Sequence, residues 1–169
     1  MSTLGFRQAA ESSVEVLLPD QQSIKVVSLP ALAILKLVAW SDHNPERGNK
    51  DASDLHLLLT KYAEAGNLDR LYACTALFER SDFDYEAASA WLLGRDVATI
   101  FVDSSAQEKS AEPRETGKAK AAEERIRAIL NEEVATESGS LAAAMNARDL
   151  EDGQRLIEWL RDGYLSVEM

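Results

Sequence analysis

A run of ten residues, ALAILKLVAW at 31–40, places the strongest constraint on how this chain folds. Every residue in it is apolar except Lys36. Ser28 and Pro30 come just before it, and both residue types are typical of a helix start, so we expect a helix from about Ser28 to about His43. A helix without a polar face must be covered by other elements on nearly all sides.

Lys36, in the middle of this helix, has two possible explanations. Its side chain could extend to the edge of the covered surface, or it could face carboxylates or phosphates in a cleft, because an unpaired buried ammonium is costly. Asp51 and Asp54 lie three residues apart and share one face of the next predicted helix. The segment NPERGN at 44–49 can join the two helices as a hairpin, which predicts that Lys36 pairs with Asp54.

The two aspartates also have a simpler explanation. Acidic residues in a first helical turn complement the helix dipole and stabilise the helix by ~0.3–1 kcal/mol each. In addition, Lys50 and Asp54 form an ordinary ion pair four residues apart on one helix. From the residues alone, both explanations stay open. If the site exists, we place Asp51 nearer to solvent than Asp54.

The rest of the chain predicts a mainly α-helical bundle with one small β-hairpin near the N-terminus. Apolar and polar residues alternate on both sides of the turn PDQQ within VEVLLPDQQSIKVV at 14–27, which is typical of two short strands. Further helices are expected from Asn49 or Lys50 to Gly66, over Leu68 to Arg80, and from a cap at Asp84 to Leu93. Gly94 is expected to interrupt the last of these, with a short helical segment over RDVATIFV at 95–102.

Residues 103–119 differ in composition from the segments on either side. They are polar and include Pro113 and Gly117, which predicts a solvated linker. We therefore expect one unit over 1–102 and a helical C-terminal segment over 120–169, built from AAEERIRAILNEEVA and the later stretch LAAAMNARDLEDGQRLIEWLRDGY.

Composition limits the functional classes. The net charge of −11 argues against non-specific binding to DNA, which needs clustered Lys and Arg. The single cysteine, Cys74, cannot form an intrachain disulfide and fits a reducing, cytoplasmic location. The start of the chain lacks the apolar run of a signal peptide, and no apolar run is long enough to cross a membrane.

Other candidate residues favour structural roles. His43 and His56 lack the spacing of a zinc site, so we expect no metal there. Cys74 lies inside a predicted apolar helix, beside Leu71 and Phe78, and is expected to be a buried structural thiol. Arg95 and Asp96 follow Gly94 and are expected to form an ion pair at a helix start. Arg47, in the loop before Asp51, is a candidate phosphate contact.

The segment VVSLPALAILKLVAWSDHNPERGNKDASDLHLLLTKY at 26–62 resembles the second half of nucleotidyltransferases of the AbiEii/AbiGii toxin type, in the DNA polymerase β-like superfamily. That family carries a lysine in a helix, a loop with an arginine, and an (R/K)-D-x-x-D-L motif. The matching residues are Lys36, then Lys50, Asp51, Asp54 and Leu55. The resemblance implies catalytic roles for Lys36 and Asp54 and nucleotide-binding roles for Arg47, Lys50 and Asp51.

The departure from the family is large. The family's catalytic core has a Gly-Ser or Gly-Gly motif and a D-x-D strand whose carboxylates bind metal, and neither precedes residue 28 here. We expect a truncated or split family member that is inactive alone, with Mg²⁺ and nucleoside triphosphate needed only if the missing half is supplied. The hairpin would then complete a nucleotidyltransferase sheet and favour a homo-oligomer or a partner subunit. The alternative is a non-catalytic helical interaction protein or an antitoxin-like regulator.

Overall fold

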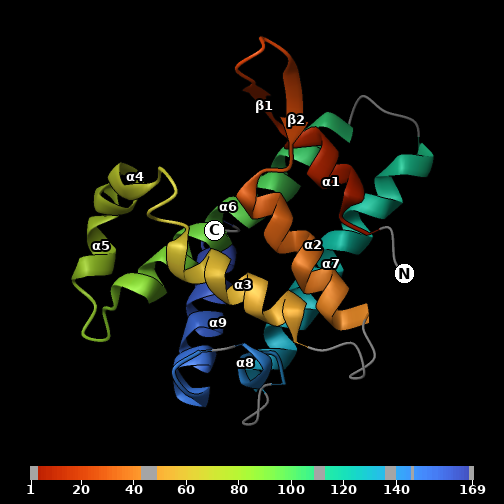
Figure 1. Cartoon of the computed structure of the whole chain (residues 1–169). Helices are drawn as coiled ribbons and strands as arrows, with labels where there is room; N and C mark the ends of the chain where they lie inside the picture. Colours follow the sequence, from red (N-terminus) through yellow and green to blue (C-terminus); the bar gives the residue numbers. More distant parts are fainter. Residues whose placement is uncertain (1–3, 43–48, 109–112, 136–139, 146, 168–169) are drawn as a thin grey trace.

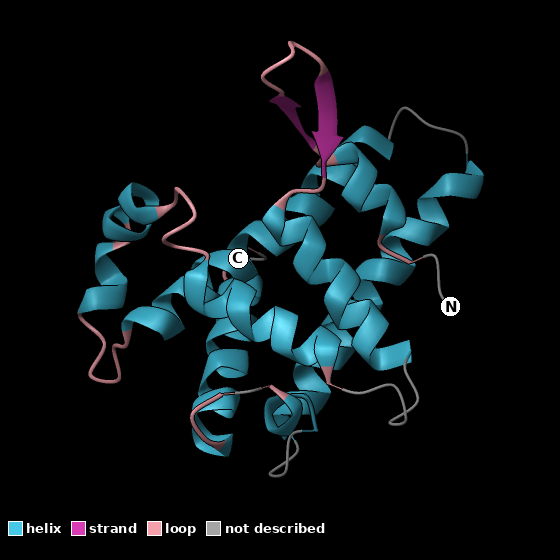
Figure 2. Ribbon diagram, viewed as in Figure 1, coloured by secondary structure: helices cyan, strands magenta, loops and turns pink. Residues whose placement is uncertain are grey.

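The computed structural model describes residues 4–42, 49–108, 113–135, 140–145 and 147–167, and this part is mainly helical, as predicted (Figures 1 and 2). Its one sheet has two strands. The elements are, in order, α1 (Phe6–Glu11), β1 (Val14–Leu17), β2 (Ser23–Val26), α2 (Leu29–Asp42), α3 (Lys50–Lys61), α4 (Leu68–Ala73), α5 (Thr75–Phe78), α6 (Tyr85–Glu108), α7 (Pro113–Ala135), α8 (Ser140–Ala144) and α9 (Leu150–Leu165).

Helix α2 is covered on several sides, as its apolar sequence predicts. It contacts α1, α3, α6 and α7, and Ala33, Ile34 and Leu37 have no exposed surface. The short helix α1, which the sequence did not suggest, packs across the first turns of α2. Gly5 begins α1 in a left-handed conformation, with φ at 85°, and a Cβ atom there would come within 3.0 Å of the Ile34 side chain. Only glycine fits this approach without a shift in its neighbours.

The most extensive helix contact joins α6 to α9. It depends on two glycines, Gly94 on α6 and Gly163 on α9. A Cβ atom at Gly94 would come closer than 3.0 Å to the backbone of Leu160, and one at Gly163 closer than 3.0 Å to the backbone of Trp91. The expected interruption of the helix at Gly94 is therefore wrong. Gly94 lies inside one continuous helix and lets the two backbones touch.

Other helix boundaries also differ from the predictions. α3 ends at Lys61 rather than Gly66, and the expected helix over Leu68–Arg80 is two short helices separated at Cys74. Within the predicted linker at 103–119, α6 continues to Glu108 and α7 begins at Pro113. Buried residues of α6, α7 and α9 belong to the same apolar cluster as those of α2 and α3. The division into two units with a linker stays a prediction.

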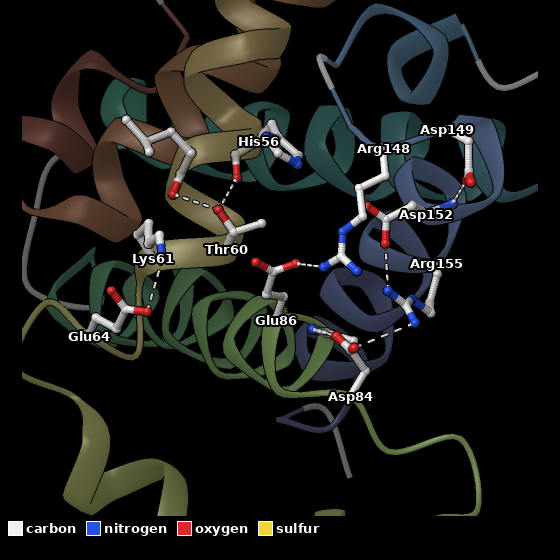
Figure 3. A network of polar contacts seen from close by, with 12 residues as sticks. His56, Thr60, Lys61, Glu64, Asp84, Glu86, Arg148, Asp149, Asp152 and Arg155 are labelled. Carbon is white, nitrogen blue, oxygen red and sulfur yellow. Dashed lines mark hydrogen bonds and ion pairs between the residues drawn. The ribbon is translucent and has the colours of Figure 1, made fainter.

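A polar network fixes the N-terminal ends of α6 and α9 beside each other (Figure 3). Asp84 accepts a hydrogen bond from the Ala87 N–H and so caps α6; Asp149 caps α9 through the Asp152 N–H. Arg155 lies within 3.6 Å of Asp84 and also binds Asp152. Because Arg155 contacts both Asp84 and Asp152, it joins the cap of α6 to the first turn of α9.

The hairpin stands clear of the helices. Its strands pair antiparallel, with Val14 opposite Val26 and Val16 opposite Ile24, which confirms the predicted hairpin. These four residues share one face, because side chains alternate along a strand. Every strand residue is exposed, and in Figure 1 the hairpin extends away from the helical body.

Candidate functional site

The structure brings Lys36 together with both aspartates. The Lys36 ammonium donates one hydrogen bond to Asp51 Oδ1 at 2.9 Å and another to Asp54 Oδ2 at 2.6 Å. The predicted ion pair between Lys36 and Asp54 is therefore confirmed. The explanation in which Lys36 merely extends to an edge is not sufficient, because its ammonium bridges two carboxylates of the next helix.

Local sequence explains why these side chains meet. α2 and α3 pack against each other, and Ala52 and Leu55 of α3 point into the core with no exposed surface. Asp51 and Asp54 precede these residues in the helix, so they lie at the border of the packed face. Lys36 precedes the buried Leu37 and reaches the same border from α2. The ion pairs of Lys36 with Asp51 and Asp54 thus lie at the edge of the interface between α2 and α3.

The site is partly shielded from water. The side chains of Lys36 and Asp51 are 20% and 19% exposed, whereas that of Asp54 is 40% exposed. The prediction that Asp51 lies nearer to solvent is wrong. Asp51 lies in the first turn, but it is the more enclosed of the two carboxylates and Asp54 opens the site to the surface.

The contacts shift the pKa values of two of these groups in opposite directions. Burial lowers the pKa of Lys36, but the hydrogen bonds to Asp54 and Asp51 together outweigh it, so the pKa lies above its ordinary value. The hydrogen bond from Lys36 holds the pKa of Asp54 below its usual range, and the positive charge of Lys50 lowers it further. Lys36 and Asp54 therefore stay charged together over a wider pH range than either would alone.

The remaining predicted site residues are less well placed. Lys50 is the first residue of α3 and acts on Asp54 through its charge. Arg47 lies outside the described residues, and so does His43. His56 uses its backbone carbonyl to accept a hydrogen bond from the Thr60 hydroxyl.

The predicted pair of Arg95 with Asp96 at a helix start is wrong. Both residues lie within α6, and Asp96 instead accepts two hydrogen bonds from Arg70 of α4, one of them at 2.7 Å. The Arg95 guanidinium lies 5.9 Å from the Trp91 ring centre and donates weakly to the Cys74 sulfur. The expectation of a buried thiol inside one helix is wrong, because Cys74 lies between α4 and α5 and is only partly buried.

Tyr62, which no sequence motif singled out, completes the cluster around Asp96. Its hydroxyl donates to Asp96, and its backbone carbonyl accepts from the Asn67 side chain at 2.9 Å. Burial raises the pKa of Tyr62, and the neighbouring Asp96 carboxylate raises it further. The cluster holds the turn after α3 against α6, which is a structural role. The partners are 34 and 26 residues apart in the chain, so no local pattern could have revealed it.

The described acidic and sulfur- or imidazole-bearing side chains do not gather into a metal site. Within the described residues, no three His, Cys, Asp or Glu side chains form a group that could hold a metal ion. Asp82-Phe83-Asp84 has the letters of a D-x-D motif, but Asp82 pairs with Arg80 and Asp84 caps α6. Lys36, Asp51 and Asp54 hold one another, so they do not fit a metal either.

Comparison with models of known protein families gives a match over most of the chain. A family model described as Nucleotidyl transferase AbiEii toxin, Type IV TA system, matches residues 4–159, which is most of the chain and includes Lys36, Asp51 and Asp54. Neither the curated proteins nor the solved structures match the chain. No helix in the described ranges has the length and hydrophobicity needed to cross a membrane.

Proposed function

Because the chain belongs to the AbiEii nucleotidyl transferase toxin family of Type IV toxin–antitoxin systems, we propose that Lys36, Asp51 and Asp54 form the phosphate-binding side of a nucleotide site. The observation that carries the proposal is the Lys36 ammonium held between two carboxylates of the neighbouring helix, at 2.9 and 2.6 Å. The activity would be transfer of a nucleoside monophosphate from a nucleoside triphosphate to an RNA or protein acceptor.

Each residue has a distinct role in this proposal. A lysine has three N–H donors, and Asp51 and Asp54 accept two of them, which fixes the ammonium and leaves one donor for a phosphate oxygen. Lys50 offsets the charge of Asp54, so the approach of an anionic triphosphate meets less repulsion. Arg47, from the loop before α3, would supply a second phosphate contact.

We further propose that the metal-binding carboxylates of the reaction come from a polypeptide segment outside this chain. The D-x-D strand of the family does not precede residue 28, and the described residues offer no metal-binding group. When bound, Mg²⁺ would neutralise the triphosphate and the developing charge. On this proposal the chain is a truncated or split family member, acts in the cytoplasm, and is inactive alone.

The missing segment, or a second copy of the chain, would join at the hairpin. Its strands have unpaired edges, and its apolar face is exposed at Val14, Val16, Ile24 and Val26. A two-stranded sheet is marginally stable alone, and open edges recruit further strands. Residues 1–102 would form the nucleotidyltransferase-like unit, with 103–119 connecting it to the C-terminal segment 120–169.

Nucleotide binding tests the role of Lys36. A fluorescent ATP analogue titrated into the purified chain should bind about tenfold more weakly to Lys36→Met, the effect of one lost charge-assisted contact. Lys25→Met, a substitution at an exposed residue of the hairpin, is the matched control, and this variant should bind the ATP analogue as tightly as the unaltered chain does. Equal binding by the Lys36→Met variant would refute the phosphate-binding role.

Transfer assays test the second part of the proposal. The isolated chain, incubated with labelled nucleoside triphosphates, Mg²⁺ or Mn²⁺ and total tRNA, should label nothing. Robust labelling that Lys36→Ala abolishes would show instead that the chain carries a complete active site.

The exposed hairpin also favours a second function, that of a non-catalytic interaction or antitoxin-like regulatory protein. In that case the apolar face would bind a partner, and Lys36 would serve only the fold. Replacing Val16 and Ile24 with lysine should leave folding intact and abolish association measured by sedimentation. If that pair of changes abolishes association while Lys36→Met leaves nucleotide binding unchanged, the second function holds.

A further inference from the structure

A second exposed feature lies apart from the Lys36 site, in the segment from Leu68 to Phe83 that contains α4 and α5. We call this segment the aromatic arm. It extends to one side of the helical body, at the left in Figures 1 and 2, and α4 contacts α6. Two of its residues, Leu71 and Leu77, are buried.

Three aromatic side chains of the arm form a row on its surface. The Tyr72 and Phe78 rings are stacked, with centres 5.9 Å apart and planes 14° apart, and the Phe78 and Phe83 rings follow at 4.9 Å. The exposed fractions of Tyr72, Phe78 and Phe83 are 58%, 40% and 36%. Large aromatic side chains gathered in this way outside a core are typical of binding surfaces.

Two exposed acidic residues of the arm, Asp69 and Glu79, lie close in sequence to the aromatic row. Asp69 shares a face of α4 with Tyr72, three residues further on, and Glu79 follows Phe78; both carboxylates are exposed. The arginines of the arm are already occupied. Arg70 is paired with Asp96, and Arg80 with Asp82 and Asp162.

The molecule already contains one example of what such a surface recognises. The Arg80 guanidinium lies 4.0 Å from the centre of the Trp159 ring and is also paired with the carboxylates of Asp82 and Asp162. An aromatic face attracts a guanidinium through its quadrupole, and carboxylates accept its N–H groups. The aromatic row presents the same two chemical groups, but facing solvent.

We propose that Tyr72, Phe78 and Phe83, with Asp69 and Glu79, bind an arginine-rich segment of a partner protein. Guanidinium groups of that segment stack on the rings and pair with the two carboxylates. A nucleic acid would also stack on aromatic rings, but it needs cations for its phosphates, and here the arm offers carboxylates in a chain of net charge −11. The proposal does not depend on the nucleotide site.

The test uses a short labelled peptide of alternating arginine and glycine and measures its fluorescence anisotropy with the full chain at physiological salt. Tyr72→Ser should weaken binding about tenfold, and so should the double change Asp69→Asn with Glu79→Gln. Tyr72 is the most exposed ring, so the fold tolerates its loss, and the carboxylate variant leaves all three rings in place. A peptide with citrulline in place of arginine should not bind.

Two matched controls separate this surface from general attraction to an acidic protein. Asp20→Asn with Glu124→Gln removes the same amount of charge on the hairpin turn and α7, and should not change the affinity. Leu57→Ser removes an apolar side chain that is 61% exposed on α3 and should also have no effect. Equal losses in the arm and control variants, unchanged binding by Tyr72→Ser, or tighter binding of single-stranded DNA than of the peptide would overturn the proposal.

Discussion

Replacing Lys36 by methionine tests how strongly the ion pairs hold α2 against α3. The change keeps the apolar stem and leaves Asp51 and Asp54 close together without a cation. Exposed pairs contribute ~0.2–1 kcal/mol, and breaking a buried pair costs ~3–5 kcal/mol. With Lys36 and Asp51 about one-fifth exposed, we expect a cost of about 2 kcal/mol in the free energy of unfolding.

The two aspartates should not be equivalent. Asp51→Ala should cost about 1–2 kcal/mol, and Asp54→Ala about 0.5–1 kcal/mol, because solvent screens the more exposed carboxylate. Urea unfolding followed by tryptophan fluorescence measures all three variants. Double-mutant cycles with Lys36→Met separate the Lys36–Asp51 coupling from the Lys36–Asp54 coupling.

The coupling should depend on pH in a defined direction. The pKa of Asp54 is lowered in the folded state, so its contribution is fully present above about pH 4 and is lost as the pH falls through the folded pKa. The pKa of Lys36 is raised, so its contribution is lost only as the pH rises past about 10.4. The reasoning would be refuted if Lys36→Met, Asp51→Ala and Asp54→Ala all left the free energy of unfolding nearly unchanged at pH 7. A coupling energy between Lys36 and Asp54 that increases in acid would refute it as well.

Three further predictions concern the framework of the site. Gly94→Ala should destabilise the fold by about 3 kcal/mol in urea unfolding, although alanine favours helices, because its Cβ overlaps the Leu160 backbone; a stabilised variant would contradict the close approach. Tyr62→Phe should reduce the loss of stability above about pH 10, because unfolded tyrosine ionises there while burial keeps Tyr62 protonated. Asp149→Ala should cost about 1 kcal/mol through loss of the α9 cap, measured by thermal unfolding, and no change would mean that the cap is not needed.

Periodicity and turn residues were enough to predict several elements. The apolar run at 31–40 predicted α2, and alternation predicted the hairpin at 14–27. The Lys36–Asp54 pair was predictable because a short loop between two helices leaves few ways for them to pack. In each of these features, the residues that interact lie close together in the sequence.

Long-range packing explains the failures. A glycine in a helix ordinarily suggests a break, and only the position of α9 explains why Gly94 does not break α6. The prediction that Asp51 is more exposed than Asp54 was wrong for a similar reason, since the burial of Asp51 depends on how α2 packs against the first turn of α3. The sequence of one helix does not contain that information.

Stability alone cannot decide whether Lys36 binds nucleotide or only joins two helices, because the ion pairs stabilise the fold in both cases. The combined change Lys36→Met, Asp51→Asn and Asp54→Asn separates the two. It removes every charge of the group while keeping its shape, and replacing a shielded charge group by neutral residues is often close to neutral for stability. We therefore expect the triple variant to unfold at nearly the urea concentration of the unaltered chain. If it also binds the fluorescent ATP analogue as well as the unaltered chain does, the group serves the fold alone; a stable variant that binds about tenfold more weakly or worse assigns the ammonium to phosphate.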